Sequence, residues 1–172
     1  MSTQYEYDGD KLIVEYWNGN TLYYVYDQNG SIAGMRYRNS SYAAEVFDEY
    51  LFEKNLQGDV VAIYDINGTK LVSYTYDAWG NFETEYHNGG GSTSARYNPF
   101  RYRGYYYDID IGMYYLQSRY YNPEWGRFIN ADKQMPSVGG DILGYNMFAY
   151  CGNNPVCNSD PSGCLWFELA AI

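Results

Sequence analysis

The sequence predicts an all-β fold built from short antiparallel hairpins. Tyrosine supplies 24 of the 172 residues, and its flat ring with a polar tip suits half-buried strand faces. Short apolar and aromatic runs alternate with turn signals, as in LIVEYW and TLYYVYD, which flank Asn18-Gly19. An Asn-Gly pair supplies the positive-φ residues of a tight hairpin. The expected architecture is therefore strand, turn and strand, repeated along the chain.

A Tyr-Asp-x-x-Gly unit accompanies these turns. It occurs at Tyr26-Asp27…Gly30, Tyr64-Asp65…Gly68 and Tyr76-Asp77…Gly80, with looser copies at Tyr107-Asp108…Gly112 and Tyr121-Asn122…Gly126. In each copy we expect Tyr to end a strand, Asp or Asn to accept hydrogen bonds from its own turn, and Gly to take the left-handed position. The copies are unevenly spaced, which predicts an irregular ribbon of hairpins.

Composition divides the chain into four parts. Residues 1–86 form the hairpin segment, within which 40–54 is compatible with a helical turn or with strands. Residues 87–98 are rich in Gly, Ser and Thr, which predicts an exposed flexible loop and the first site of proteolytic nicking. Residues 99–164 are denser in aromatics and arginines and form a compact module, and 165–172 form a C-terminal tail.

Charge and cysteine content exclude several kinds of site. A net charge of −10 disfavours a nucleic-acid binder and an anionic membrane surface. The spacing of Cys151, Cys157 and Cys164 is not that of a zinc knuckle, and the sole histidine, His87, lies far away in sequence. We therefore expect no metal, no cofactor and no disulfide framework. No stretch is long and apolar enough to span a membrane, and MSTQYEYDGDKL lacks the layout of a signal peptide.

The C-terminal half carries a set of ordered motifs. They are R-Y-R-G-Y-Y-Y-D, S-R-Y-Y-N-P-x-x-G-R-F, N-x-F-A-Y-x-x-N-N-P-V and D-P-S-G, all within residues 100–163. In this order they closely resemble the core-associated module that ends the YD-repeat shell of Rhs proteins and their insecticidal-toxin relatives. Residues 55–81 resemble ordinary repeats of that family. The resemblance covers about residues 50–163.

The resemblance implies a fold and a role. The N-terminal hairpins would form part of a hollow β-shell, and the C-terminal module would be a compact plug at one end. Many family members cut themselves just after D-P-x-G and so free a toxic cargo. Carried over by position, the cutting residues are Asp132, Asp160 and the supporting Arg119. Where the family usually has Leu after this motif, Cys164 stands here, so the expected scissile bond is Cys164–Leu165.

The chemistry of this set is that of an aspartic protease. Two carboxylates held close together cannot both ionise cheaply, so one keeps a proton and the other activates water. The acid polarises the scissile carbonyl, and a guanidinium orients the ionised partner. The expected enzyme is a self-cleaving aspartic protease in a toxin-delivery or interbacterial-competition context.

The resemblance also implies partners and a location. The partners would be the toxin or effector cargo of a parent shell, the rest of that shell, or a second copy of the chain. The chain would be bacterial, and cytoplasmic until secreted or displayed as part of a larger protein. The sequence leaves open whether it is a whole gene product or an excised fragment.

Other interpretations remain open at this stage. Cys164 after Gly163 is compatible with an intein-like acyl shift to sulfur, although the histidines of such sites are missing. Cys151 or Cys157 with His87 would be a thiol-protease pair. Abundant Tyr and Trp are compatible with a carbohydrate platform. The main alternative is a non-catalytic β-rich structural or binding module that self-associates through open sheet edges.

Overall fold

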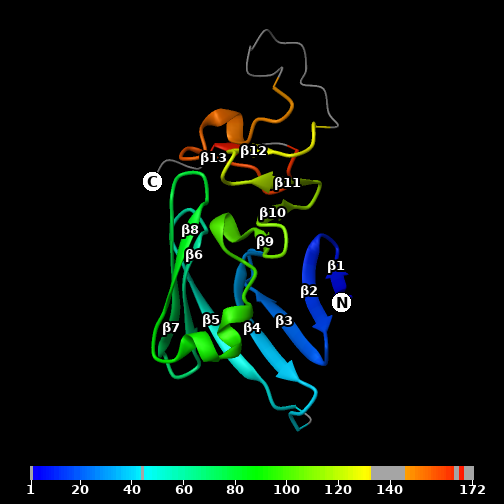
Figure 1. Ribbon diagram of the computed structural model, residues 1–172, viewed down its shortest axis with the longest axis vertical. Coiled ribbons are helices and arrows are strands. Elements are labelled where there is room, and N and C mark those ends of the chain that lie inside the picture. Colours follow the sequence, from blue (N-terminus) through cyan, green and yellow to red (C-terminus); the bar gives the residue numbers. More distant parts are fainter. Residues whose placement is uncertain (1, 44, 133–145, 165–166, 169–172) are drawn as a thin grey trace. The chain divides into compact units, whose positions relative to one another are not determined.

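The computed structural model describes residues 2–43, 45–132, 146–164 and 167–168 (Figure 1). The chain divides into two units, residues 1–74 with 84–98 and residues 75–83 with 99–172. Strands and single 3₁₀ turns make up the regular structure of the described residues, which confirms the all-β prediction. No helix within these residues is long and apolar enough to cross a membrane.

The first sheet is a meander in which every strand pairs with the next one in sequence. Its strands are β1 (Gln4–Asp8), β2 (Lys11–Trp17), β3 (Asn20–Tyr26), β4 (Ile32–Asn39), β5 (Asp48–Lys54), β6 (Val60–Asp65), β7 (Lys70–Tyr76) and β8 (Phe82–Tyr86). Between residues 40 and 54, the segment that was compatible with helix or strand, the structure has the strand β5. The tip of the β7–β8 hairpin belongs to the second unit.

The core of the first unit comes from alternate positions on these strands. Met35, Ile63 and Val72 are fully buried, and the strand register, in which Ile63 lies opposite Val72, places them on one face. Glu15 on β2 is also buried, and its carboxylate accepts a hydrogen bond from the Tyr24 hydroxyl at 2.9 Å. A buried acid on a strand is stable only with such a partner.

The predicted turn chemistry is confirmed in the three closest copies of the repeat. Asp65 Oδ1 accepts the backbone N–H groups of Asn67 and Thr69, and Gly68 has a φ of +81°. The turns at Asp27 and Asp77 have the same two bonds and the same left-handed glycine. A further copy escapes the sequence pattern because it has no preceding tyrosine: Asn55 accepts from Gln57 and Asp59, with Gly58 left-handed.

These turns predict a loss of stability in acid. The N–H of Thr69, followed by that of Asn67, lowers the pKa of Asp65 because both bonds favour its charged form. A folded-state pKa below the unfolded value gives stability that is present above the unfolded pKa and lost as the pH falls through the folded one. Asp65→Asn keeps the acceptor oxygen and has no charge to lose.

We therefore expect the free energy of unfolding of the wild type to decline relative to Asp65→Asn as the pH falls from about 5 to about 2. Urea unfolding at several pH values measures this difference. Asp27→Asn should behave in the same way, because the backbone N–H of Ser31, followed by that of Asn29, also lowers the pKa of Asp27. A difference that stays constant across this range would contradict the assignment.

Residues 87–98, predicted as an exposed flexible loop, are instead partly buried and ordered into two 3₁₀ turns, η1 (Gly90–Ser92) and η2 (Ser94–Tyr97). Gly90, Ser94 and Ala95 are buried. A side chain at Gly90 would overlap the carbonyl of Leu71, so this glycine serves close packing. The Ser94 hydroxyl bonds to Tyr50 at 2.6 Å and to Asp48 at 2.8 Å.

The second unit contains a smaller antiparallel sheet and a two-stranded ladder. The sheet order is β12-β11-β10-β9, and β13 pairs with β14. The strands are β9 (Tyr106–Asp108), β10 (Met113–Leu116), β11 (Arg119–Asn122), β12 (Arg127–Phe128), β13 (Asn158–Ser159) and β14 (Phe167–Glu168), with 3₁₀ turns η3 (Tyr102–Gly104) and η5 (Cys151–Asn153).

Tyrosines form most of the core of this unit, and their hydroxyls meet at one turn. Tyr102, Tyr114 and Tyr121 are buried together with Phe128 and Tyr150. The first three donate hydrogen bonds to the carbonyl oxygens of Ala78, Gly80 and Trp79, respectively, at 2.7–2.9 Å. Burial of Tyr is favourable only when the hydroxyl finds such an acceptor. The aromatic core is thus built around the tip of a Tyr-Asp-x-x-Gly hairpin.

Candidate functional site

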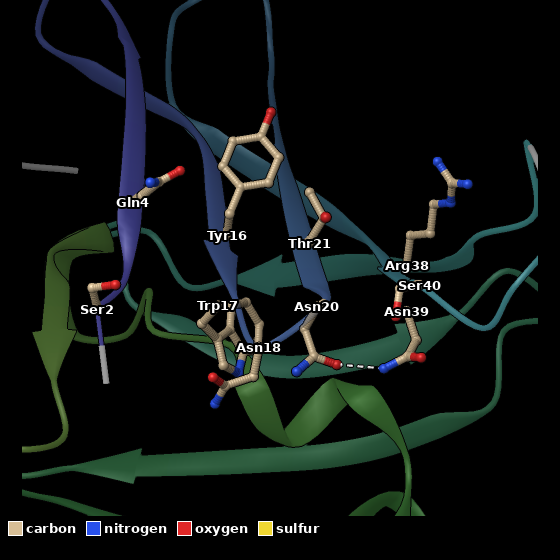
Figure 2. A pocket seen from close by; sticks show the side chains of 11 residues that line it. Ser2, Gln4, Tyr16, Trp17, Asn18, Asn20, Thr21, Arg38, Asn39 and Ser40 are labelled. Atoms are coloured by element: carbon tan, nitrogen blue, oxygen red, sulfur yellow. Dashed lines mark hydrogen bonds between the residues drawn. The ribbon is translucent and has the colours of Figure 1, made fainter.

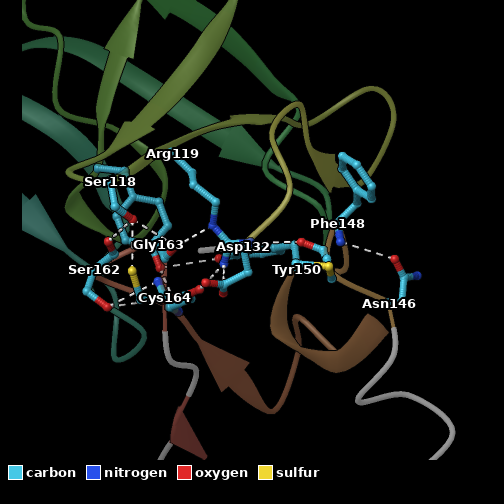
Figure 3. Close-up of polar contacts among 12 residues, drawn as sticks. Ser118, Arg119, Asp132, Asn146, Phe148, Tyr150, Ser162, Gly163 and Cys164 are labelled. Atoms are coloured by element: carbon cyan, nitrogen blue, oxygen red, sulfur yellow. Dashed lines mark hydrogen bonds and ion pairs between the residues drawn. The ribbon is translucent and has the colours of Figure 1, made fainter. Parts of the chain in front are cut away.

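Arg119 is the centre of a buried polar cluster in the second unit (Figure 3). It is the first residue of β11, its side chain is only 7% exposed, and its guanidinium lies 3.6 Å from the centre of the Phe128 ring. The ring covers one face of the cation and removes it from water. Such a cation needs anionic or carbonyl partners around its edge.

Two carboxylates supply the anionic partners. Nη2 of Arg119 lies 3.0 Å from Oδ2 of Asp132 and 3.5 Å from Oδ2 of Asp160. The side chains of Asp132 and Asp160 are 13% and 3% exposed, respectively. Both carboxylates therefore contact the same nitrogen. The structure therefore brings together the three residues that the sequence singled out.

The backbone carbonyl of Met147 fixes one side of this cluster. It accepts a hydrogen bond from Nη1 of Arg119 at 3.0 Å and another from the N–H of Asp132, also at 3.0 Å. The cation and the backbone that carries Asp132 are thus tied to the same acceptor. The hydrogen bond from its own N–H holds the backbone of Asp132 in place. Asp132 is followed by residues 133–145, which lie outside the described part of the chain.

The Asp-Pro-Ser-Gly motif, residues 160–163, forms the other side of the Arg119 cluster. Gly163, with a φ of +68°, turns its carbonyl oxygen toward Nε of Arg119 and Oγ of Ser118, both of which donate to it. Oδ1 of Asp160 accepts the N–H of Cys164 at 3.1 Å. Asp160 therefore contacts the guanidinium with one oxygen and the backbone of the motif with the other.

Two contributors were missed from the sequence. Ser118 precedes Arg119 in the S-R-Y-Y motif, and its hydroxyl contacts the carbonyls of Ser162 and Gly163 at 2.7 and 2.9 Å. The hydroxyl of Tyr105 accepts the N–H of Asp160 at 3.1 Å. In the sequence, only their places in the R-Y-R-G-Y-Y-Y-D and S-R-Y-Y motifs could have indicated Tyr105 and Ser118. Of the expected scissile bond, Cys164 is described, whereas Leu165 lies outside the described residues.

Gly163→Ala should disrupt this arrangement. A Cβ at this position would lie 2.5 Å from the carbonyl oxygen of Leu116, and a positive φ adds strain for any other residue. Gly112→Ala is the matched control: its φ is +69°, and the nearest atom to the added carbon is at 3.6 Å. We expect urea unfolding to give an additional loss of about 1–3 kcal/mol for Gly163→Ala over Gly112→Ala. Equal losses would show that the close approach to Leu116 is unimportant.

The thiol-protease alternative with Cys151 finds little support. Burial raises the pKa of the Cys151 thiol to about 12, which keeps it protonated and a poor nucleophile. Nε2 of His87 is within 2.8 Å of the Ser73 hydroxyl. All three cysteines are free thiols. Among the described residues, no group of three or more His, Cys, Asp or Glu side chains is placed to hold a metal ion.

The first unit has an open polar pocket at the β2–β3 turn, of about 460 Å³ (Figure 2). Tyr16, Trp17, Asn20 and Asn39 are among its lining residues, and Asn39 donates a hydrogen bond to Asn20 at 2.7 Å. The Trp17 ring packs edge-on against Tyr97, with centroids 5.6 Å apart. One aromatic ring of this pocket is thus already in contact with another side chain of the protein.

Comparison with known proteins finds one matching family model and several proteins of similar sequence. The family model described as RHS Repeat matches residues 55–93. The tRNA3(Ser)-specific nuclease WapA of Bacillus spizizenii is 42% identical over 94% of this chain, and the tRNA nuclease WapA of Bacillus subtilis is 41% identical over the same share. The chain spans 6% of the length of each. Toxin protein Tse5 of Pseudomonas aeruginosa is 42% identical over 38% of this chain and 5% of its own length.

Solved structures share the fold. The crystal structure of TcdB2-TccC3 aligns with a TM-score of 0.66 and 23% identity over 91% of this chain and 7% of that one. A Tc holotoxin pore of Photorhabdus luminescens aligns with a TM-score of 0.62 and 20% identity over 99% of this chain and 9% of that one. The repeat turns, the family model and the similar sequences agree: the chain belongs to the RHS-repeat, or YD-repeat, proteins.

Proposed function

We propose that this chain is a toxin-related RHS-repeat segment that hydrolyses its own backbone after Cys164. The observation that carries the proposal is the shared guanidinium of Arg119, which contacts Asp132, Asp160 and the carbonyl of Gly163. A purely structural ion pair needs one carboxylate. A second carboxylate beside the same cation, next to the motif, is the arrangement that acid–base hydrolysis requires.

The charge balance of the cluster favours one proton on the carboxylate pair. One guanidinium compensates one negative charge, and two ionised carboxylates beside it would leave a charge in a site that excludes most water. Asp132 has the shorter contact with Arg119 and the greater exposure, and is the base that activates water. Asp160 is more deeply buried, contacts the N–H of Cys164, and is the acid that polarises the next carbonyl.

The context of this activity is delivery of a toxin, either against competing bacteria or against a host. The support is similarity: the relatives include proteins named as nucleases and toxins, and the similar structures include a Tc holotoxin pore. The partner would be the cargo or the remaining shell of a longer protein. Cleavage beside the motif would separate these two parts without disturbing the aromatic core of the second unit.

Intact-mass measurement of the purified chain tests the proposal. After incubation at several pH values and denaturation, we expect a product ending at Cys164 and the peptide 165–172, LWFELAAI. Asp132→Asn should stop their formation. Breakage after Asp160 would report only the ordinary acid lability of an Asp-Pro bond. A wild-type chain that stays full length for days would overturn the proposal and favour the non-catalytic binding module.

A further inference from the structure

The peptide bond between Gly163 and Cys164 is held at both of its polar ends (Figure 3). Its carbonyl oxygen accepts hydrogen bonds from Nε of Arg119 and from Oγ of Ser118. Its N–H donates to Oδ1 of Asp160 at 3.1 Å. A cation and a hydroxyl at the oxygen, with a carboxyl group at the nitrogen, are the groups that would stabilise an oxyanion and protonate a departing amine.

The hydroxyl of Ser118 also determines where the thiol of Cys164 lies. A serine has one hydrogen to donate, and two carbonyl oxygens, those of Ser162 and Gly163, are within 2.9 Å. Sγ of Cys164 lies 3.1 Å from the same oxygen, so the thiol is the donor in that contact. The sulfur of Cys164 and the carbonyl oxygen of Gly163 therefore both contact Oγ of Ser118.

We infer that this site performs an N-to-S acyl shift at Gly163–Cys164, a second activity that involves a different bond and a different nucleophile from the proposed hydrolysis. With the shared proton of the pair on Asp132 and Asp160 ionised, the sulfur of Cys164 attacks the carbonyl carbon of Gly163 as the thiol proton passes to Asp160. The C–N bond then breaks, the proton passes from Asp160 to the released nitrogen, and a thioester links Gly163 to the Cys164 side chain. This product has the same mass as the original chain. A thiol or water then cleaves the thioester.

The geometry supplies what the sequence lacks. Acyl shifts of this kind need activation of the carbonyl and protonation of the leaving nitrogen, and no histidine is near the motif in the sequence. Here Arg119 and Ser118 act on the carbonyl and Asp160 acts on the nitrogen. Gly163 has no side chain to block approach to its carbonyl carbon, and the nucleophile belongs to the adjoining residue, which makes the attack intramolecular.

A thioester exchanges with an added thiol, whereas an ordinary peptide bond does not. The full chain is incubated at neutral pH with 2-mercaptoethanesulfonate, denatured and measured by intact mass. We expect the thioester of residues 1–163 with the added thiol, together with peptide 164–172, CLWFELAAI. Cys164→Ala should abolish both products. Ser118→Ala, which removes one donor to the oxyanion, should slow their formation by about 100-fold.

The matched control is Cys157→Ala, which removes an exposed thiol outside the cluster and should react like the wild type. A chain that gives no thiol adduct at Gly163, or a Cys164→Ala variant that still releases residues 164–172, would overturn the inference. The products also separate the two proposals in a single sample. Hydrolysis by the aspartates gives peptide 165–172, with or without thiol. The acyl shift gives peptide 164–172, and added thiol speeds its release and leaves an adduct on Gly163.

Discussion

Replacing Arg119 with methionine is expected to lower the free energy of unfolding by about 3–5 kcal/mol. The substitution leaves the carboxylates of Asp132 and Asp160 without the cation that they share, in a site where their side chains are 13% and 3% exposed. It also leaves the carbonyls of Met147 and Gly163 without their guanidinium donor. Methionine fills a similar volume over the Phe128 ring, so most of the loss is electrostatic. Urea unfolding at neutral pH measures it.

Arg36→Met is the matched control. Arg36 also lies over an aromatic ring, that of Phe47 at 4.2 Å, and is also paired with a carboxylate, Glu49 at 2.7 Å. Both members of that pair are 44% exposed, so solvent screens the interaction and we expect a loss below about 1 kcal/mol. Similar losses for the two arginines would show that the buried cluster contributes no more than a surface pair.

Asp160→Asn is expected to slow release of peptide 165–172 by at least about 100-fold, the usual contribution of a general acid or base. Asparagine keeps an oxygen that can accept the N–H of Cys164, so the backbone of the motif stays in place. It can no longer transfer a proton. The rate is followed by intact mass, and the fold is checked by the urea midpoint.

Asp108→Asn serves as the control for this substitution. Asp108 ends β9 and accepts the N–H of Asp110 at 3.1 Å, an ordinary turn bond that asparagine can also make. Its release rate should equal that of the wild type. If Asp160→Asn also cleaved at the wild-type rate while retaining its stability, Asp160 would be only a residue that positions the turn.

The local parts of the fold could be predicted from the sequence because their causes are local. Asn18-Gly19 and the Tyr-Asp-x-x-Gly units determine their turns within a few residues, and both residues of Asn18-Gly19 have positive φ. The same turn at Asn55 was missed because the pattern required a tyrosine that the hydrogen bonds do not use. The Gly-, Ser- and Thr-rich composition of residues 87–98 predicts a flexible loop, whereas Gly90 packs against Leu71.

The candidate site could be predicted only in part. Arg119, Asp132 and Asp160 were found through their places in motifs, but nothing in their spacing required them to meet, since Met147 and Gly163 bring them together through the tertiary structure. Ser118 was missed for the same reason. The abundance of tyrosine predicted strands, but its role in the second unit depends on hydroxyls that reach the carbonyls of residues 78–80, a contact between distant segments.

The pairing of β13 with β14 has a consequence for what happens after a cut. Asn158 and Ser159 pair with Glu168 and Phe167 across the motif, so both candidate bonds lie in the loop of a small hairpin. While the chain is intact, this loop keeps the two strands at a high effective concentration. Breaking it would turn an intramolecular pairing into association between separate molecules, held by two residue pairs. Scission and departure would then be separate steps, and a nicked chain would lose its peptide on dilution.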